Sequence, residues 1–144
     1  MVYGVILRSD GGPSRGLLEA AIEDVVASNV GYFHAEWRAG REPPCCLGCG
    51  EVRYVPDEPG TFSEVVGARQ VLRDGKASCQ SAAAYYAGRE RALAMWNGES
   101  PERARQLHRV QLDARTHPGA PDGYWHALVL GPDGLVDVTE EMPR

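Results

Sequence analysis

The chain has 144 residues, of which 43% are hydrophobic and 24% are charged, and its formal net charge is −5. This length and composition are typical of one globular domain with its own core, so we expect residues 1–144 to form a single domain. The acidic balance disfavours nucleic acid and anionic membrane surfaces as partners, because both attract basic patches.

The sequence contains no apolar run that approaches the ~20 residues of a membrane span. The opening residues MVYGVIL lack the basic segment and cleavage site of a signal peptide. Without a signal peptide, the four cysteines are expected to be thiols rather than disulfides.

The N-terminal part predicts a strand, a helix and a long loop. Residues 2–8, VYGVILR, are short and apolar, as in a strand. The segment LLEAAIEDVVASNVG repeats apolar residues at helical spacing, and Asn29 and Gly31 suit the end of that helix. Residues 38–60 are rich in proline and glycine and predict a loop, with a short strand in EVRYV (51–55).

Two helices are predicted in the middle of the chain. TFSE (61–64) has the pattern of a capping box, with Thr61 as the N-cap and Glu64 three residues later, so a helix is expected from there to Gly75. The alanine-rich segment at about 79–96 predicts the second helix.

The C-terminal third predicts strands. RARQLH (103–108) fits no single pattern, whereas HRVQLDA (108–114) alternates like a strand and THPGAPDG (116–123) predicts a loop. YWHALVL, GPDG and LVDVTEE then form a hairpin signature over 124–141. Helices followed by strands predict an α+β fold: N-terminal helices with an antiparallel sheet that ends in a C-terminal hairpin.

This hairpin brings a histidine and an aspartate onto one face. If its turn centres on Pro132 and Asp133, Leu130 faces Leu135, and His126 and Asp137 become diagonal neighbours on adjacent strands. An aspartate that is a diagonal neighbour of a histidine can orient the imidazole and stabilise its charged form.

Cys79 is the candidate nucleophile for this pair. It stands at the predicted start of the second helix, where unpaired N–H groups and the helix dipole favour a thiolate. A nearby imidazolium would favour the thiolate further. The alternative interpretation of Cys79 is a small buried residue of an alanine-rich helix.

Three motifs in this order resemble the transglutaminase-like branch of the papain-like cysteine peptidase superfamily, most closely its small phage-encoded members. They are GKASC (75–79), HALV (126–129) and DVT (137–139). The resemblance covers residues 61–141, and residues 1–60 match only loosely. One departure is Ala77, which stands where the family motif has its second glycine.

The resemblance implies a papain-like core and a catalytic triad. Cys79 would be the nucleophile, His126 the general base and acid, and Asp137 the residue that orients the histidine. The implied activity is acyl transfer, most simply hydrolysis of a peptide or isopeptide bond in a protein or peptide substrate. No cofactor is implied. The phage likeness suggests virion assembly or processing, other phage structural proteins as partners, and a location in the host cytoplasm or virion.

Other features leave alternatives open. Gln70, Gln80 and Trp125 are all candidates for the oxyanion donor. The fold could also serve as a non-catalytic structural or adaptor subunit of a phage-like particle.

CCLGCG (45–50) contains half of a zinc-knuckle pattern in Cys46 and Cys49, and would allow a zinc-stabilised binding module. The other candidate ligands, Cys45, His34, His108 and His117, are scattered in the sequence. We therefore expect no metal site at these cysteines.

Overall fold

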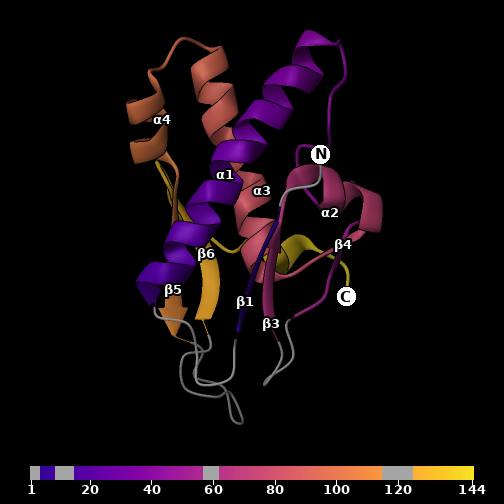
Figure 1. Cartoon of the computed structure of the whole chain (residues 1–144). Coiled ribbons are helices and arrows are strands. Elements are labelled where there is room, and N and C mark those ends of the chain that lie inside the picture. Colours follow the sequence, from indigo (N-terminus) through magenta and orange to yellow (C-terminus); the bar gives the residue numbers. More distant parts are fainter. Residues whose placement is uncertain (1–3, 9–14, 57–61, 115–124) are drawn as a thin grey trace.

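Helices and small sheets form an α+β fold (Figure 1). The computed structural model describes residues 4–8, 15–56, 62–114 and 125–144. The helices in these ranges are α1 (Arg15–Arg38), α2 (Ala68–Asp74), α3 (Cys79–Trp96), α4 (Pro101–Leu107) and the 3-10 helix η1 (Val138–Glu141). The strands are β1 (Gly4–Arg8), β2 (Arg53–Tyr54), β3 (Phe62–Val66), β4 (Lys76–Ala77), β5 (Arg109–Ala114), β6 (Trp125–Gly131) and β7 (Gly134–Val136).

The strands pair in three small sheets. β1 pairs with β3 in antiparallel orientation, and β2 with β4 in parallel orientation. At the C-terminus β5, β6 and β7 form an antiparallel sheet in that order, as the sequence predicted. Leu130 pairs with Leu135 and Gly131 with Gly134, so the predicted hairpin register is confirmed.

α3 is the central element of the core. Ala82, Ala83, Ala84 and Ala87 are completely buried along it. These small side chains let α3 pack against α1 and, near its lower end in Figure 1, against β6. Tyr85 contributes a large buried ring, which meets Phe33 of α1 edge to face at 5.1 Å.

The closest approach of α1 and α3 occurs at Gly88 and Asn29. A Cβ atom placed on Gly88 would lie 2.5 Å from the Asn29 Cβ and 3.3 Å from the Val26 carbonyl oxygen. The buried Asn29 amide donates to the Ala84 carbonyl at 2.9 Å, and its oxygen accepts from the Ala68 backbone N–H at 2.8 Å. One side chain therefore connects α1, α3 and the first residue of α2.

The buried Arg91 side chain connects α3 to α1 and to the end of α4. Its guanidinium donates to both carboxylate oxygens of Glu23 in α1, at 2.8 and 2.7 Å, and its Nε donates to the His108 carbonyl at 2.7 Å. Burial disfavours the charged form of Glu23, but Arg91 outweighs it and holds the pKa of that carboxyl below its usual value.

Two local predictions differ from the structure. Residues 62–66 form β3 rather than the start of a helix, so the capping-box interpretation of TFSE is wrong; Thr61 itself lies outside the described residues. Pairing with β1 overrides the local signal there. α1 continues past Asn29 and Gly31 to Arg38, because Asn29 bonds to neighbouring elements rather than capping its own helix.

The remaining segments agree with the expected pattern or add to it. α3 has the predicted bounds, and RARQLH falls mainly in α4, which begins after the N-cap Ser100. The loop predicted at THPGAPDG lies outside the described residues.

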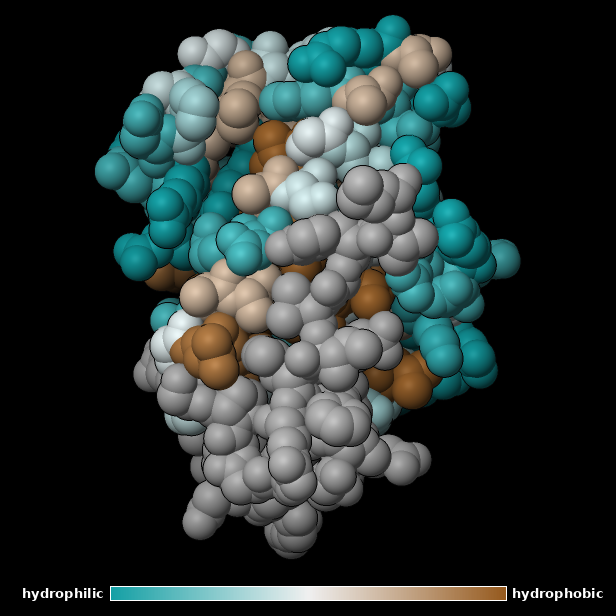
Figure 2. Space-filling view, in the orientation of Figure 1, coloured by the Kyte–Doolittle hydropathy of each residue, from teal (hydrophilic) through white to brown (hydrophobic). Residues whose placement is uncertain are grey.

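The surface is polar over most of its helical part. On the face seen in Figure 2, hydrophilic residues cover most of the top and the sides, and most of the visible apolar residues lie in the lower half. Within the described ranges, no helix has the length and apolar character needed to cross a membrane.

The α1–α3 crossing predicts opposite effects for two glycine-to-alanine substitutions. Gly88→Ala should lower the free energy of unfolding by about 1–3 kcal/mol, because the new methyl group overlaps the Asn29 side chain. Gly31→Ala is the matched control, since Gly31 is an exposed residue of α1 with nothing within 4 Å of an added Cβ. This control should be neutral or stabilising by up to about 1 kcal/mol. Urea unfolding measures both, and a Gly88→Ala variant as stable as Gly31→Ala would contradict the close crossing.

Candidate active site

A sharp turn leads the chain into α3. α2 ends at Gly75, which adopts a left-handed conformation with φ of 65° and donates its N–H to the Val71 carbonyl. Lys76 and Ala77 then pair with Arg53 and Tyr54. Gly75 carries the positive φ of the turn, whereas Ala77 lies in a short strand and has none. The alanine at this position is therefore compatible with the turn.

Ser78 caps α3 and places Cys79 as its first residue. The Ser78 hydroxyl accepts from the Ser81 backbone N–H at 3.2 Å, and the Ser81 hydroxyl accepts from the Val66 N–H of β3 at 3.0 Å. The first N–H groups of a helix cannot be satisfied within it, and the helix dipole is positive at this end. Cys79 thus lies where a negative charge on sulfur is favoured.

Cys79 lies against the beginning of β6. Its side chain is buried, with 5% of the residue exposed, and its Sγ is 3.9 Å from the Trp125 carbonyl oxygen. The next residue, Gln80, donates its side-chain amide to the same carbonyl at 3.4 Å. Since Trp125 directly precedes His126, these contacts bring the start of α3 to the histidine-bearing strand.

His126 and Asp137 are in direct contact, as the hairpin register predicted. The His126 Nε2 is 2.8 Å from the Asp137 Oδ2. β7 ends at Val136, and Asp137 caps η1, where its Oδ1 accepts from the Thr139 N–H at 3.1 Å and from the Thr139 hydroxyl at 2.7 Å. One carboxylate oxygen is therefore fixed by the helix cap while the other meets the imidazole.

This environment keeps Asp137 ionised. Burial raises the pKa of its carboxyl, but the hydrogen bonds from Thr139 and His126 outweigh that effect and bring the pKa below its usual value. An ionised Asp137 can only accept hydrogen bonds, so the His126 Nε2 must carry the proton between them. In the neutral imidazole the lone pair then lies on Nδ1.

Two of the three oxyanion candidates lie next to Cys79. Gln80 and Trp125 meet at the Trp125 carbonyl, as described above. The Gln80 Oε1 is buried and accepts no hydrogen bond from the part of the chain that the structure describes. Gln70 instead bonds to Asp74 on the exposed side of α2, with 3.3 Å between Nε2 and Oδ2.

A second carboxylate near the histidine could not be identified from the sequence. Asp113 of β5 is the direct partner of His126 in the sheet, and its carboxylate accepts from the Gln111 side chain at 3.0 Å. HRVQLDA predicted the strand but not its register, because the predicted loop before β6 gave no fixed turn from which to count pairs.

The three clustered cysteines comprise one disulfide and one free thiol. Their sulfur atoms all lie within 4.8 Å of one another, and Cys46 and Cys49 are joined as a disulfide. The expectation that all four cysteines are thiols is therefore wrong for these two, because their turn brings the Cα atoms to 5.3 Å. Two of the weak zinc candidates are thereby removed as ligands. Of the other candidates, His34 bonds to the Ala92 carbonyl at 2.9 Å, and His117 lies outside the described residues.

The ionised state of Asp137 predicts a pH-dependent contribution to stability. Its folded pKa lies below the unfolded value of about 3.9, so the ionised carboxylate stabilises the fold at neutral pH. Asp137→Asn should lower the free energy of unfolding by about 1–3 kcal/mol at pH 7. This difference should shrink as the pH falls through the lowered pKa, because protonation removes the same charge from the parent protein.

Urea unfolding of the parent protein and of Asp137→Asn, at pH values from 7 down to below the lowered pKa of Asp137, measures this effect. Asp133→Asn, in the exposed turn of the same hairpin, is the control and should change stability by less than about 0.5 kcal/mol. A penalty for Asp137→Asn that stays constant into acid would contradict the lowered pKa.

The disulfide predicts which cysteines react in the unfolded chain. When protein purified without reductant is unfolded and alkylated, Cys45 and Cys79 should carry label, and Cys46 and Cys49 should acquire it only after reduction. Peptide mass spectrometry shows which cysteines carry the label before and after reduction. Label on all four cysteines before reduction, or stoichiometric zinc that is lost in Cys46→Ser, would contradict the disulfide.

Comparison with known proteins leaves the site to be interpreted from its own geometry. The chain matches no protein-family model, no curated protein and no solved structure. The resemblance to the transglutaminase-like branch therefore rests on three short motifs and on the contacts that bring Cys79, His126 and Asp137 into one region.

Proposed function

We propose that this chain is a cysteine-dependent acyl-transfer enzyme with a papain-like core, acting as a peptidase or amidase. The observation that carries the proposal is the His126–Asp137 hydrogen bond of 2.8 Å, together with the Cys79 Sγ at 3.9 Å from the carbonyl of the residue before His126. Nucleophile, base and orienting acid thus come from three elements that are separate in the sequence.

In this mechanism His126 activates Cys79. With Asp137 ionised and Nε2 protonated, Nδ1 of His126 takes the thiol proton. Asp137 holds the imidazole in that tautomer and stabilises the imidazolium that forms. The N-terminus of α3 stabilises the thiolate at the same time.

The reaction then proceeds in two steps. The Cys79 thiolate attacks the amide carbonyl carbon, and the imidazolium gives its proton to the leaving amine as the C–N bond breaks, which leaves a thioester. A water molecule, deprotonated by His126, attacks the thioester and restores the thiol, with release of a carboxylate. A lysine amine in place of water would give cross-linking.

Two groups near Cys79 are suited to stabilise the oxyanion. The Cys79 backbone N–H belongs to the first turn of α3 and points away from the helix. The Gln80 amide forms only a long hydrogen bond, 3.4 Å, to Trp125, so it can turn toward a developing negative charge at little cost.

The substrate class we propose is a peptide or isopeptide bond in a protein. A pocket of about 340 Å³ borders Asp137 and is lined by residues of the Cys46–Gly48 loop, by Tyr86 and by residues 135–138, 140 and 141. It offers room beside Asp137 for a substrate side chain. Phage virion assembly or processing is the setting that the motif resemblance suggests.

The burial of Cys79 favours a second candidate function. At 5% exposure a substrate carbonyl must displace neighbouring groups to reach the sulfur. A non-catalytic structural or adaptor subunit would keep the same contacts for packing alone. In that case the thiol would behave as an ordinary buried cysteine.

Alkylation of the native protein distinguishes these two functions. Iodoacetamide should label Cys79 quickly at pH 6 as well as at pH 8, because an activated cysteine remains a thiolate below the ordinary pKa of about 8.5. His126→Ala should slow the labelling at pH 6 by at least about tenfold, since the imidazolium partner is lost. Mapping the labelled peptides by mass spectrometry over time gives the rates.

His34→Ala is the matched control, because His34 bonds to the Ala92 carbonyl near the other end of α3 and should leave the Cys79 rate unchanged. Slow labelling of Cys79 at both pH values, with Cys45 modified first, would favour the non-catalytic subunit. Equal rates in the parent protein and His126→Ala would also reject the triad.

A further inference from the structure

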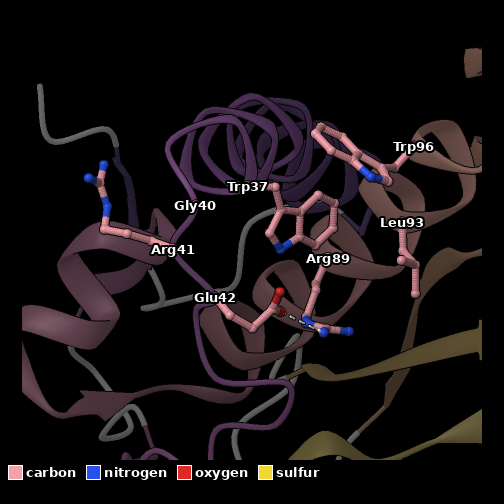
Figure 3. Close-up of a pocket in the computed structure, with 7 residues that line it drawn as sticks. All are labelled: Trp37, Gly40, Arg41, Glu42, Arg89, Leu93 and Trp96. Atoms are coloured by element: carbon pink, nitrogen blue, oxygen red, sulfur yellow. Dashed lines mark hydrogen bonds and ion pairs between the residues drawn. The ribbon is translucent and has the colours of Figure 1, made fainter.

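A second pocket lies at the end of α3 opposite Cys79. It has a volume of about 330 Å³ and is lined in part by Trp37, Glu42, Arg89, Leu93 and Trp96 (Figure 3). Arg89 and Trp96 lie ten and seventeen residues after Cys79 in the same helix, so roughly 15–25 Å of helix separates the two sites. This pocket is therefore independent of the proposed triad.

Two buried hydrogen-bond donors in this pocket are unsatisfied. The Trp37 Nε1 and the Arg89 Nε have no acceptor within the described ranges. A buried donor without an acceptor is unfavourable and rare in folded proteins, so two on residues that line one pocket require an explanation. Figure 3 shows the indole nitrogen on the side of the Trp37 ring that faces Glu42 and Arg89.

Glu42 accepts a hydrogen bond from only one nitrogen of the Arg89 guanidinium. A single hydrogen bond of 3.1 Å joins the Arg89 Nη2 to the Glu42 Oε1, and Glu90 lies at 3.7 Å from the Arg89 Nη1. The Arg89 side chain is 14% exposed, whereas that of Glu42 is 64% exposed. Since the Glu42 side chain is mostly in solvent and forms only one hydrogen bond to Arg89, another carboxylate can displace it at low cost.

The apolar side of the pocket suits a flat group. The rings of Trp37 and Trp96 meet edge to face with centroids 5.5 Å apart, and the half-exposed Trp96 and the neighbouring Leu93 present apolar surface to solvent. Aromatic faces of this kind bind planar groups by stacking and by burial of apolar area.

We propose that this pocket binds a carboxylate carried on a flat apolar group, and that the ligand takes the place of the Glu42 side chain. A carboxylate can accept from the Nε and Nη2 of one guanidinium in a bidentate pair, which Glu42 does not form. The Trp37 N–H then donates to the same carboxylate, while the apolar group packs on Trp37 and Trp96. The exchange replaces one negative charge by another and leaves the net charge of the pocket unchanged.

Phenylacetate is a probe of this chemistry, and phenylacetamide is its neutral control. The full chain contains three tryptophans, so an ¹⁵N-labelled sample gives three indole N–H signals, and Trp37→Phe assigns one of them. Phenylacetate should shift the Trp37 indole N–H signal downfield in a saturable manner as it forms a hydrogen bond. Phenylacetamide should bind at least about tenfold more weakly, since it cannot form the charged bidentate pair.

The decisive variant is Glu42→Gln, which removes the competing charge at an exposed position and should tighten phenylacetate binding by about three- to tenfold. Trp37→Phe keeps an aromatic ring without the N–H and should weaken binding by about fivefold, measured in this variant from the indole signal of Trp96. Arg89→Lys keeps the positive charge but cannot form the bidentate pair. It should weaken phenylacetate binding more than tenfold. Circular dichroism confirms that each variant is folded.

Several results would overturn the proposal. They are no saturable shift of the Trp37 signal, equal binding of phenylacetate and phenylacetamide, or binding that Glu42→Gln weakens. Alkylation of Cys79 by iodoacetamide should be the same in Glu42→Gln as in the parent protein, so this test is separate from that of the triad.

Discussion

The close crossing of α1 and α3 at Gly88 is the constraint on which the rest of the structure depends. Because no side chain stands between the helices there, the Asn29 amide reaches the Ala84 carbonyl and also the first N–H of α2. That contact fixes where α2 begins, and α2 leads through Gly75 into the turn before Cys79. The position of the sulfur is therefore set from the middle of the core, by residues distant from it in the sequence.

The parts of the fold that the sequence predicted are those that local chemistry determines. α3 has Ser78 as its cap and a continuous run of helix-forming residues, and the last hairpin has a turn that allows only one pairing of its strands. The His126–Asp137 contact follows from that pairing by counting along two adjacent strands. Where register comes from a short turn, the sequence contains enough information to place a side chain.

The parts that the sequence did not predict depend on partners far along the chain. FSEVV has a local helix-start signal, yet it pairs with residues 4–8, which lie more than fifty residues earlier. Asn29 looks like a helix end because asparagine is a common cap, but here its amide bonds to two other elements, α3 and α2. Arg91 is a charged residue within α3, and only the approach of α1 makes it a buried cation that is paired with Glu23.

Asp137 would join a structural task to the proposed chemical one, since the same carboxylate caps η1 and contacts the imidazole. This sharing has an evolutionary consequence. In a lineage that abandoned catalysis, selection for the folded C-terminus would retain the aspartate long after selection on the cysteine had ceased. Under the proposed function, Cys79 rather than Asp137 is thus the position that would distinguish active from inactive descendants of such a chain.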